Sequence, residues 1–145
     1  MEGMSIIVKK VSQLLAGLIF VYGIYIILHG HLTPGGGFAG GAIIAGAFIL
    51  LILANGSSAL NLKKEISGSS NTESLAILMV VVLAMMSLAF GVKVFFSNFL
   101  PKGEPGELLS AGVIPLYNIF IGIEVAGAIL TIFLALVIFK EESSK

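Results

Sequence analysis

One carboxylate of this sequence lies inside a segment apolar enough to cross a membrane. Glu124 stands eight residues after Leu116, about 12 Å along a helix, and the segment has no other charged residue before Phe139. An ionised carboxylate in hydrocarbon is costly unless it is paired or hydrated, so we expect Glu124 to face a partner or a water cavity. It is interpreted either as a relay for protons or cations, or as a buried acid that fixes how helices pack.

Two further side chains complete the candidates for ion translocation, Lys93 and His31. Lys93 ends the third apolar stretch, where a lysine is expected to snorkel to the outer interface, and a pair with Glu124 is the alternative. His29 and His31 flank Gly30 and could bind a metal or respond to pH. No Cys, Asp or third His is close in sequence, so we predict interfacial hydrogen bonding and no metal site.

Glycine is the most conspicuous residue of the segment that joins the first two apolar stretches. Small residues four apart let another helix approach closely, and in a membrane such packing replaces the hydrophobic effect as the attraction. The segment lacks a GxxxxGK[ST] loop and follows an apolar helix, so phosphate binding is excluded and a packing or hairpin role is predicted. The residues concerned are Pro34, Gly35, Gly36, Gly37, Gly40, Gly41 and Gly46.

Composition excludes several classes of function. The chain is 57% hydrophobic and 11% charged, far from the roughly 25% charged residues of soluble domains. A net charge of zero gives no reason to expect nucleic acid as a partner. The absence of cysteine excludes disulfides, thiolate metal sites and thiol catalysis. With no nucleophile–base pair and no nucleotide loop, we expect neither enzymatic activity nor a cofactor.

Four stretches are long enough, or nearly so, to position these residues across a membrane. They cover residues 11–28, 38–54, 75–92 and 116–139, against a requirement of about 20 residues for a spanning helix. Backbone groups in lipid must be paired within the segment, and the stretches do not alternate as barrel strands do. The sequence therefore predicts an all-α integral membrane protein with four transmembrane helices, in a single transmembrane domain over residues 1–145.

The connections between these stretches differ in character. Residues 29–37 are expected to form a tight hairpin, residues 55–73 a polar connection with a flexible SGSSN run, and residues 97–115 a segment whose LLSAGVI stretch lies at the interface. The positive-inside rule then places both termini in the cytoplasm of a multi-pass protein of the cell membrane. It does so because one side collects most of the lysines, namely Lys9, Lys10, Lys63, Lys64, Lys140 and Lys145.

The hairpin sequence HGHLTPGGGFAGGAIIAGAFILL, from His29 to Leu51, closely resembles a family signature. In the B subunit of multisubunit Na+/H+ antiporters of the Mrp (Mnh) type, a Gly-His-x-x-Pro-Gly-Gly-Gly-Phe-x-Gly-Gly stretch joins the first two of four helices. The likeness extends over most of the chain, more weakly after residue 60, and Glu124 lies outside the motif. The matching residues are Gly30, His31, Pro34, Gly35, Gly36, Gly37, Phe38, Gly40 and Gly41.

The resemblance implies a small accessory subunit that supports assembly and the translocation of Na+ and H+, beside other membrane subunits of an Mrp-type module in a lipid bilayer. Similar modules occur in archaeal membrane-bound hydrogenases and sulfur-reducing complexes, so a subunit of a redox-driven respiratory complex is the alternative. A third interpretation is a self-sufficient transporter or channel formed by several copies. It is disfavoured because the sequence has one intramembrane charge and shows no inverted repeat.

Overall fold

The computed structural model describes residues 4–56, 62–91, 94–108 and 110–143, and its helices confirm the predicted all-α membrane architecture. Each of the four helices is long and apolar enough to cross a membrane. They are α1 (Ile6–Leu28), α2 (Gly36–Asn55), α3 (Leu62–Ala89) and α4 (Ile114–Ser143). All four run beyond the predicted apolar stretches at one end or both.

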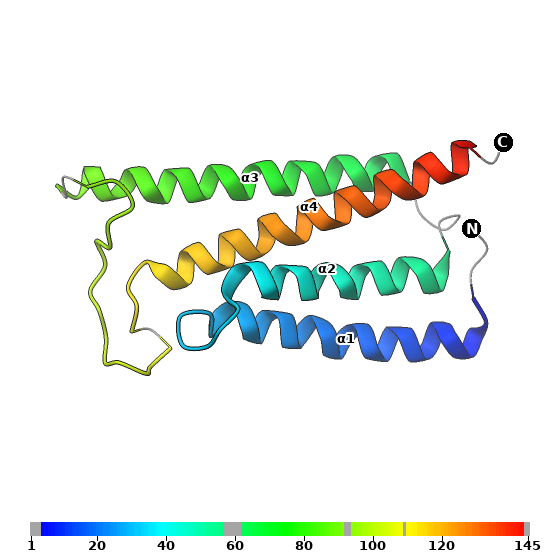
Figure 1. Cartoon of the computed structure of the whole chain (residues 1–145), viewed down its shortest axis with the longest axis horizontal. Helices are drawn as coiled ribbons and strands as arrows, with labels where there is room; N and C mark the ends of the chain where they lie inside the picture. Colours follow the sequence, from blue (N-terminus) through cyan, green and yellow to red (C-terminus); the bar gives the residue numbers. More distant parts are fainter. Residues whose placement is uncertain (1–3, 57–61, 92–93, 109, 144–145) are drawn as a thin grey trace.

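The helices do not lie in sequence order. Figure 1 shows α4 running obliquely between α2 and α3, while α1 packs beside α2 on the far side. The start of α1, the end of α2, the start of α3 and the end of α4 share one end of the bundle, and the α1–α2 hairpin lies at the other. α3 is also displaced along the bundle, so that its end extends beyond the tip of the hairpin.

Local chemistry explains where the hairpin turns. The carbonyl of His29 accepts hydrogen bonds from the backbone N–H of Thr33 at 2.9 Å and from its hydroxyl at 3.1 Å, which closes α1. Gly35 and Gly36 then have φ angles of 134° and 63°, a region that residues with a Cβ avoid. The chain can therefore reverse within a few residues only because glycine follows Pro34.

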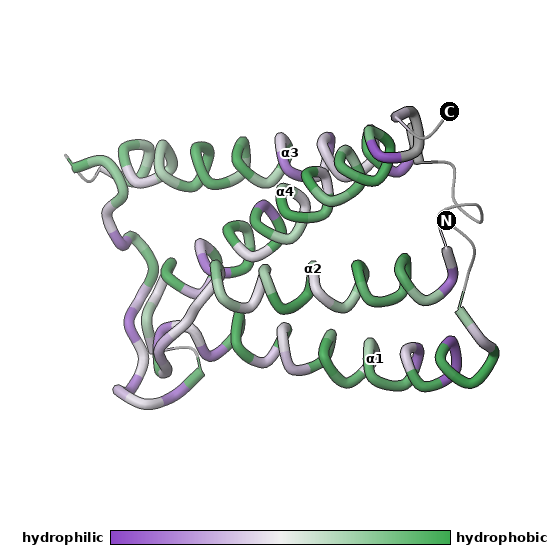
Figure 2. The backbone as a smooth tube through the Cα atoms, turned by 45° about the vertical axis from the view of Figure 1, so that its right-hand side comes forward, coloured by the Kyte–Doolittle hydropathy of each residue, from purple (hydrophilic) through white to green (hydrophobic). Residues whose placement is uncertain are grey.

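The third helix differs most from the prediction. The prediction of a polar, flexible connection up to Glu73 is wrong, because α3 already begins at Leu62. The helix ends at Ala89, before the predicted end at residue 92. The polar residues stay helical because they pack on α4, where the hydroxyl of Ser69 donates to the carbonyl of Gly127 at 2.8 Å. Figure 2 shows the second half of α3 as mostly hydrophobic, with hydrophilic stretches where the helix passes α4.

The long connection before α4 is held by one amide side chain. Asn98 donates from Nδ2 to the carbonyl of Ala111 at 3.1 Å, and its Oδ1 accepts from the backbone N–H of Val113 at 3.1 Å. Phe90 and Phe99 stack with ring centroids 4.9 Å apart. The described residues of the LLSAGVI stretch are not helical up to Val113, and α4 starts at its last residue, Ile114.

Candidate functional site

The paired glycines of α2 form two adjacent contact rows. Gly40 faces α1, and a Cβ on it would lie 2.8 Å from the carbonyl oxygen of Gly23. Gly37 and Gly41 face α4, and a Cβ on Gly41 would lie 2.5 Å from the carbonyl oxygen of Gly122. These separations are far below van der Waals contact, so both neighbours approach the backbone of α2 only because it carries no side chain there.

Ile27 of α1 fills the space where these three helices meet. Its side chain is 6% exposed, and a Cβ added to Gly40 or to Gly122 would collide with it. One branched side chain thus packs between two glycine backbones, as a knob does in a hole. We call the arrangement the glycine corner, formed by Gly23, Ile27, Gly37, Gly40, Gly41 and Gly122.

Other residues of the predicted packing set lie outside this corner. Pro34 is exposed in the hairpin and precedes the turn at Gly35. Gly46 is exposed, and a Cβ on it would have no heavy atom within 4 Å in the described part of the chain. Gly46 therefore makes no close helix contact among the described residues, and its packing role stays a prediction.

Asn118 of α4 supplies a cap that α2 lacks. The N-cap residue Gly35 has no side chain to bind the first N–H groups of α2, and the Oδ1 of Asn118 accepts from the N–H of Gly37 at 3.4 Å. This hydrogen bond joins α4 to α2. Its Nδ2 is buried without a partner among the described residues. A side chain from the last helix thus fixes the start of the second.

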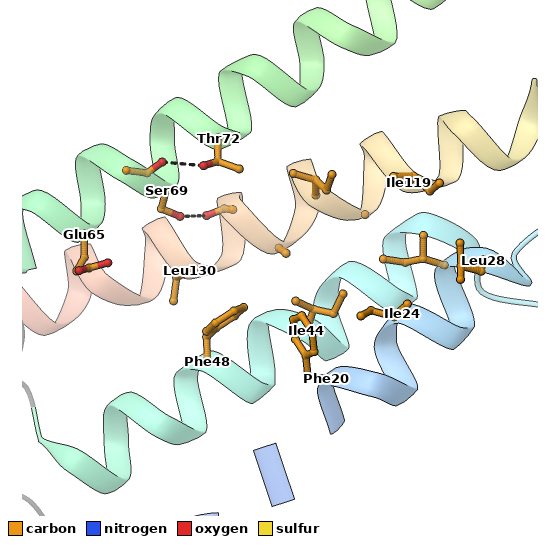
Figure 3. Close-up of a pocket in the computed structure, with 16 residues that line it drawn as sticks. Phe20, Ile24, Leu28, Ile44, Phe48, Glu65, Ser69, Thr72, Ile119 and Leu130 are labelled. Carbon is orange, nitrogen blue, oxygen red and sulfur yellow. Dashed lines mark hydrogen bonds between the residues drawn. The ribbon is translucent and has the colours of Figure 1, made fainter. Parts of the chain in front are cut away.

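A cleft of about 600 Å³ is lined by residues of all four helices, with α4 between α3 and the α1–α2 pair (Figure 3). Its walls are largely apolar, with Phe20 and Phe48 on one side and Leu130 on α4. Its polar wall comes from α3, where three residues spaced by four and three positions share a face. They are Glu65, Ser69 and Thr72. The hydroxyls of Ser69 and Thr72 donate to backbone carbonyls, so their oxygens can still accept a hydrogen bond or bind a cation.

The cleft extends from the start of α3 to the apolar middle of the bundle. Glu65 shares it with Phe20 and Phe48, which lie near the middle of α1 and α2. The expectation that Glu124 is the only carboxylate within a span is therefore wrong, because Glu65 and Glu73 belong to the span Lys64–Ala89. The reason is the early start of α3, which draws a polar segment into the bundle.

Glu124 lies on the same face of α4 as Gly127, one helical turn earlier, and is half-buried. A Cβ on Gly127 would lie 3.2 Å from the carbonyl oxygen of Ser69 and 3.4 Å from the Cβ of Glu73. We call this contact the polar seam, formed by Ser69, Glu73 and Gly127. Glu124 thus lies one helical turn from the position at which α4 contacts Glu73 of α3.

Of the two remaining ion-translocation candidates, the structure describes only His31, which is not among the residues that line the cleft. His31 donates from Nε2 to the carbonyl of Glu107 at 3.2 Å, which joins the hairpin to the connection before α4. Its Nδ1 is buried without a partner in the part of the chain that the structure describes. Lys93 lies outside the described residues, and its pairing with Glu124 stays a prediction.

Sequence reasoning missed several residues of these contacts, among them Gly122, Glu65 and Ser69. A signal for Gly122 was present, because Asn118, Gly122 and Ala126 repeat at the same four-residue spacing as the glycines of α2. The spacing of Glu65, Ser69 and Thr72 also fits one helix face. It was hidden by the serine-rich composition that suggested a flexible connection.

Comparison with known proteins extends over all four helices. A domain described as related to the MnhB subunit of Na+/H+ antiporters matches residues 7–131. A Staphylococcus aureus protein named as antiporter subunit mnhB2 is 29% identical over 143 residues, which are 94% of this chain and 96% of that protein.

Two longer archaeal proteins are more similar in sequence. An uncharacterised protein of Methanocaldococcus jannaschii is 35% identical over 130 residues, 86% of this chain and 49% of that protein. A chain in the structure of the membrane-bound sulfane sulfur reductase, an archaeal respiratory membrane complex, is 34% identical with a TM-score of 0.73. That match covers 89% of this chain and 56% of the other. The chain thus spans about half the length of these archaeal relatives.

Proposed function

This chain belongs to the family of the MnhB subunit of Na+/H+ antiporters, and from this membership we propose that it is a non-catalytic subunit of an Mrp-type antiporter complex. In that role it supports the assembly of other membrane subunits and the translocation of Na+ and H+. The S. aureus relative supports the proposal, since that antiporter subunit is matched over almost its whole length.

The observation that supports a role of this chain in ion translocation is the cleft lined by Glu65. Acidic residues within membrane-spanning segments face a water-filled cavity or pair with a partner, and Glu65 lines a cleft whose walls are largely apolar. The hydroxyl oxygens of Ser69 and Thr72 add oxygen ligands of the kind that hard cations prefer. We propose that Glu65, with Glu124 across the polar seam, contributes to the ion route of the complex.

Neutral variants of both acids test this role. Glu65→Gln and Glu124→Gln, each placed in the whole complex, should lower Na+-dependent proton movement in inverted vesicles and leave the yield of the complex unchanged. Glu104→Gln is the matched control, because Glu104 is exposed in the connection before α4. Unchanged transport in both variants would contradict the relay hypothesis and favour a packing role. Loss of the complex in these variants would have the same meaning.

A second candidate function has a specific observation in its favour. The likeness to a chain of an archaeal respiratory complex supports a subunit of a redox-driven pump, in which the same residues would do the same work. Affinity purification of the tagged chain in mild detergent, followed by mass spectrometry, separates the two. Antiporter-type membrane subunits alone indicate an independent antiporter, and iron–sulfur or nickel–iron proteins beside them indicate a redox-driven complex. Isolation without membrane partners would contradict both.

We also propose that both termini face the cytoplasm. The first turns of α1 and the last turns of α4 share one end of the bundle, and Lys9, Lys10 and Lys140 lie there. The chain lacks cysteine, so Ser143→Cys and Glu104→Cys give single labelling sites at opposite ends. An impermeant maleimide should label Glu104→Cys in intact cells and Ser143→Cys only in inverted vesicles. The reverse pattern would invert the topology.

A further inference from the structure

The outward face of α3 changes polarity halfway along the helix. Its first turns expose four polar residues spaced by three or four positions, which places them on one face. We call them the polar stripe: Lys64, Ser67, Asn71 and Ser74. The same face continues with apolar residues, of which Leu78 is 56% and Met85 57% exposed.

The stripe faces away from the other helices that the structure describes. On the opposite side of the same turns, Ser69 and Glu73 pack against Gly127 of α4. The side between these two faces carries Glu65 and Thr72, which line the cleft. The first half of α3 therefore carries polar residues on three sides, a pattern that is not stable against lipid.

The stripe also lies at membrane depth. Ser69, level with its centre, donates to Gly127 near the middle of α4, and Glu65 shares a cleft with Phe20 and Phe48. Lys64 is nearest the end of the bundle, and its long stem can carry the ammonium toward water. Asn71 and Ser74 lie about two and three turns deeper and have short side chains, so they cannot reach it.

The outer face of α1 is apolar and contrasts with the polar stripe of α3. Leu14 and Leu18 are 69% and 63% exposed there, and the face is apolar over the middle of the helix. An amide and hydroxyls placed against hydrocarbon lose hydrogen bonds to water and gain none. The two faces therefore have different neighbours in the membrane.

We propose that the polar stripe is the docking surface for a transmembrane helix of another subunit, one with hydrogen-bonding side chains opposite Asn71 and a carboxylate opposite Lys64. Serines at the edges of the stripe let such a helix approach closely, and polar side chains then bond across the contact. The inference rests on the proposed function in one respect, that other membrane subunits are present.

Substitution by leucine tests the stripe without disturbing the interior. Ser67→Leu combined with Asn71→Leu should reduce the complex recovered with the tagged chain about tenfold, since two interhelical hydrogen bonds are lost. The thermal melting of the isolated chain in detergent should not change, because both side chains are exposed. Leu78→Ala, on the apolar part of the same face, is the matched control and should retain the complex. Normal recovery with the double variant would overturn the proposal.

A photocrosslinker identifies the neighbour directly. Asn71→Cys provides a unique thiol for a benzophenone maleimide, because the chain has no cysteine. Within the purified complex, light should join this position to a peptide from an apolar, helical segment of another subunit that contains Asp or Glu. Adducts with lipid alone would overturn the stripe as a protein interface. A wild-type chain that purifies with no partner contradicts the proposed function instead, so the two failures are distinguishable.

Discussion

The glycine corner and the polar seam join α4 to its two neighbours by different means. At the corner, the backbones of α2 and α4 meet at Gly41 and Gly122, and Ile27 closes the remaining space. At the seam, a side-chain hydroxyl of α3 bonds to the carbonyl of Gly127, and acidic residues lie on either side. The corner needs only shape, whereas the seam brings polar groups into the depth of the membrane.

This difference separates what the chain completes by itself from what it leaves to others. At the corner, glycine rows on α2 find their partners within the chain. Around the seam, the cleft and the polar stripe present charged and hydrogen-bonding groups on two further sides of α3. A chain that stabilises one half and leaves the other half unsatisfied is suited to be a component of a larger assembly.

The largest effect is expected from filling the corner. Gly41→Leu places a Cβ against the carbonyl of Gly122, a backbone atom that cannot turn aside, and should lower the stability of the isolated chain by about 3 kcal/mol. Gly46→Leu, on the same helix with open space around it, is the control and should melt like the wild type. Equal melting temperatures of both variants in mild detergent would contradict the close contact.

A smaller effect is expected from removing the cap that α4 provides. Asn118→Ala leaves the N–H of Gly37 without its acceptor and should cost about 1–2 kcal/mol of stability. Asn118→Asp keeps an acceptor oxygen at the same place and adds a negative charge that the start of α2 favours, so it should retain most of the stability. Thermal melting of both variants decides the point, and an equally large loss in Asn118→Asp would argue against capping.

The smallest effect is expected at the seam. Ser69→Ala removes one interhelical hydrogen bond, worth about 0.6 kcal/mol on average in membrane proteins, so the isolated chain should be only slightly less stable. Ser67→Ala, an exposed serine two residues earlier, should have no effect on the isolated chain. If Ser69→Ala were as damaging as Gly41→Leu, the contrast between corner and seam would be lost.

The hairpin could be predicted from sequence and the start of α3 could not. Glycines at four-residue spacing have one physical use in a membrane helix, so the segment around Gly37 and Gly41 indicated close packing before its partner was known. Residues 62–74 carry no such local signal, since serine and glycine are typical of loops. Their helix depends on packing against Gly127, a contact more than 50 residues away that local patterns do not contain.

Placing α4 between α2 and α3 has a consequence for biosynthesis. A chain made from its N-terminus delivers α1, α2 and α3 to the membrane before α4 has left the ribosome. Until then Gly41 faces no Gly122, the first N–H groups of α2 have no Asn118, and the hydroxyl of Ser69 has no Gly127 carbonyl. Insertion of the last helix therefore completes the glycine corner and the polar seam in one step.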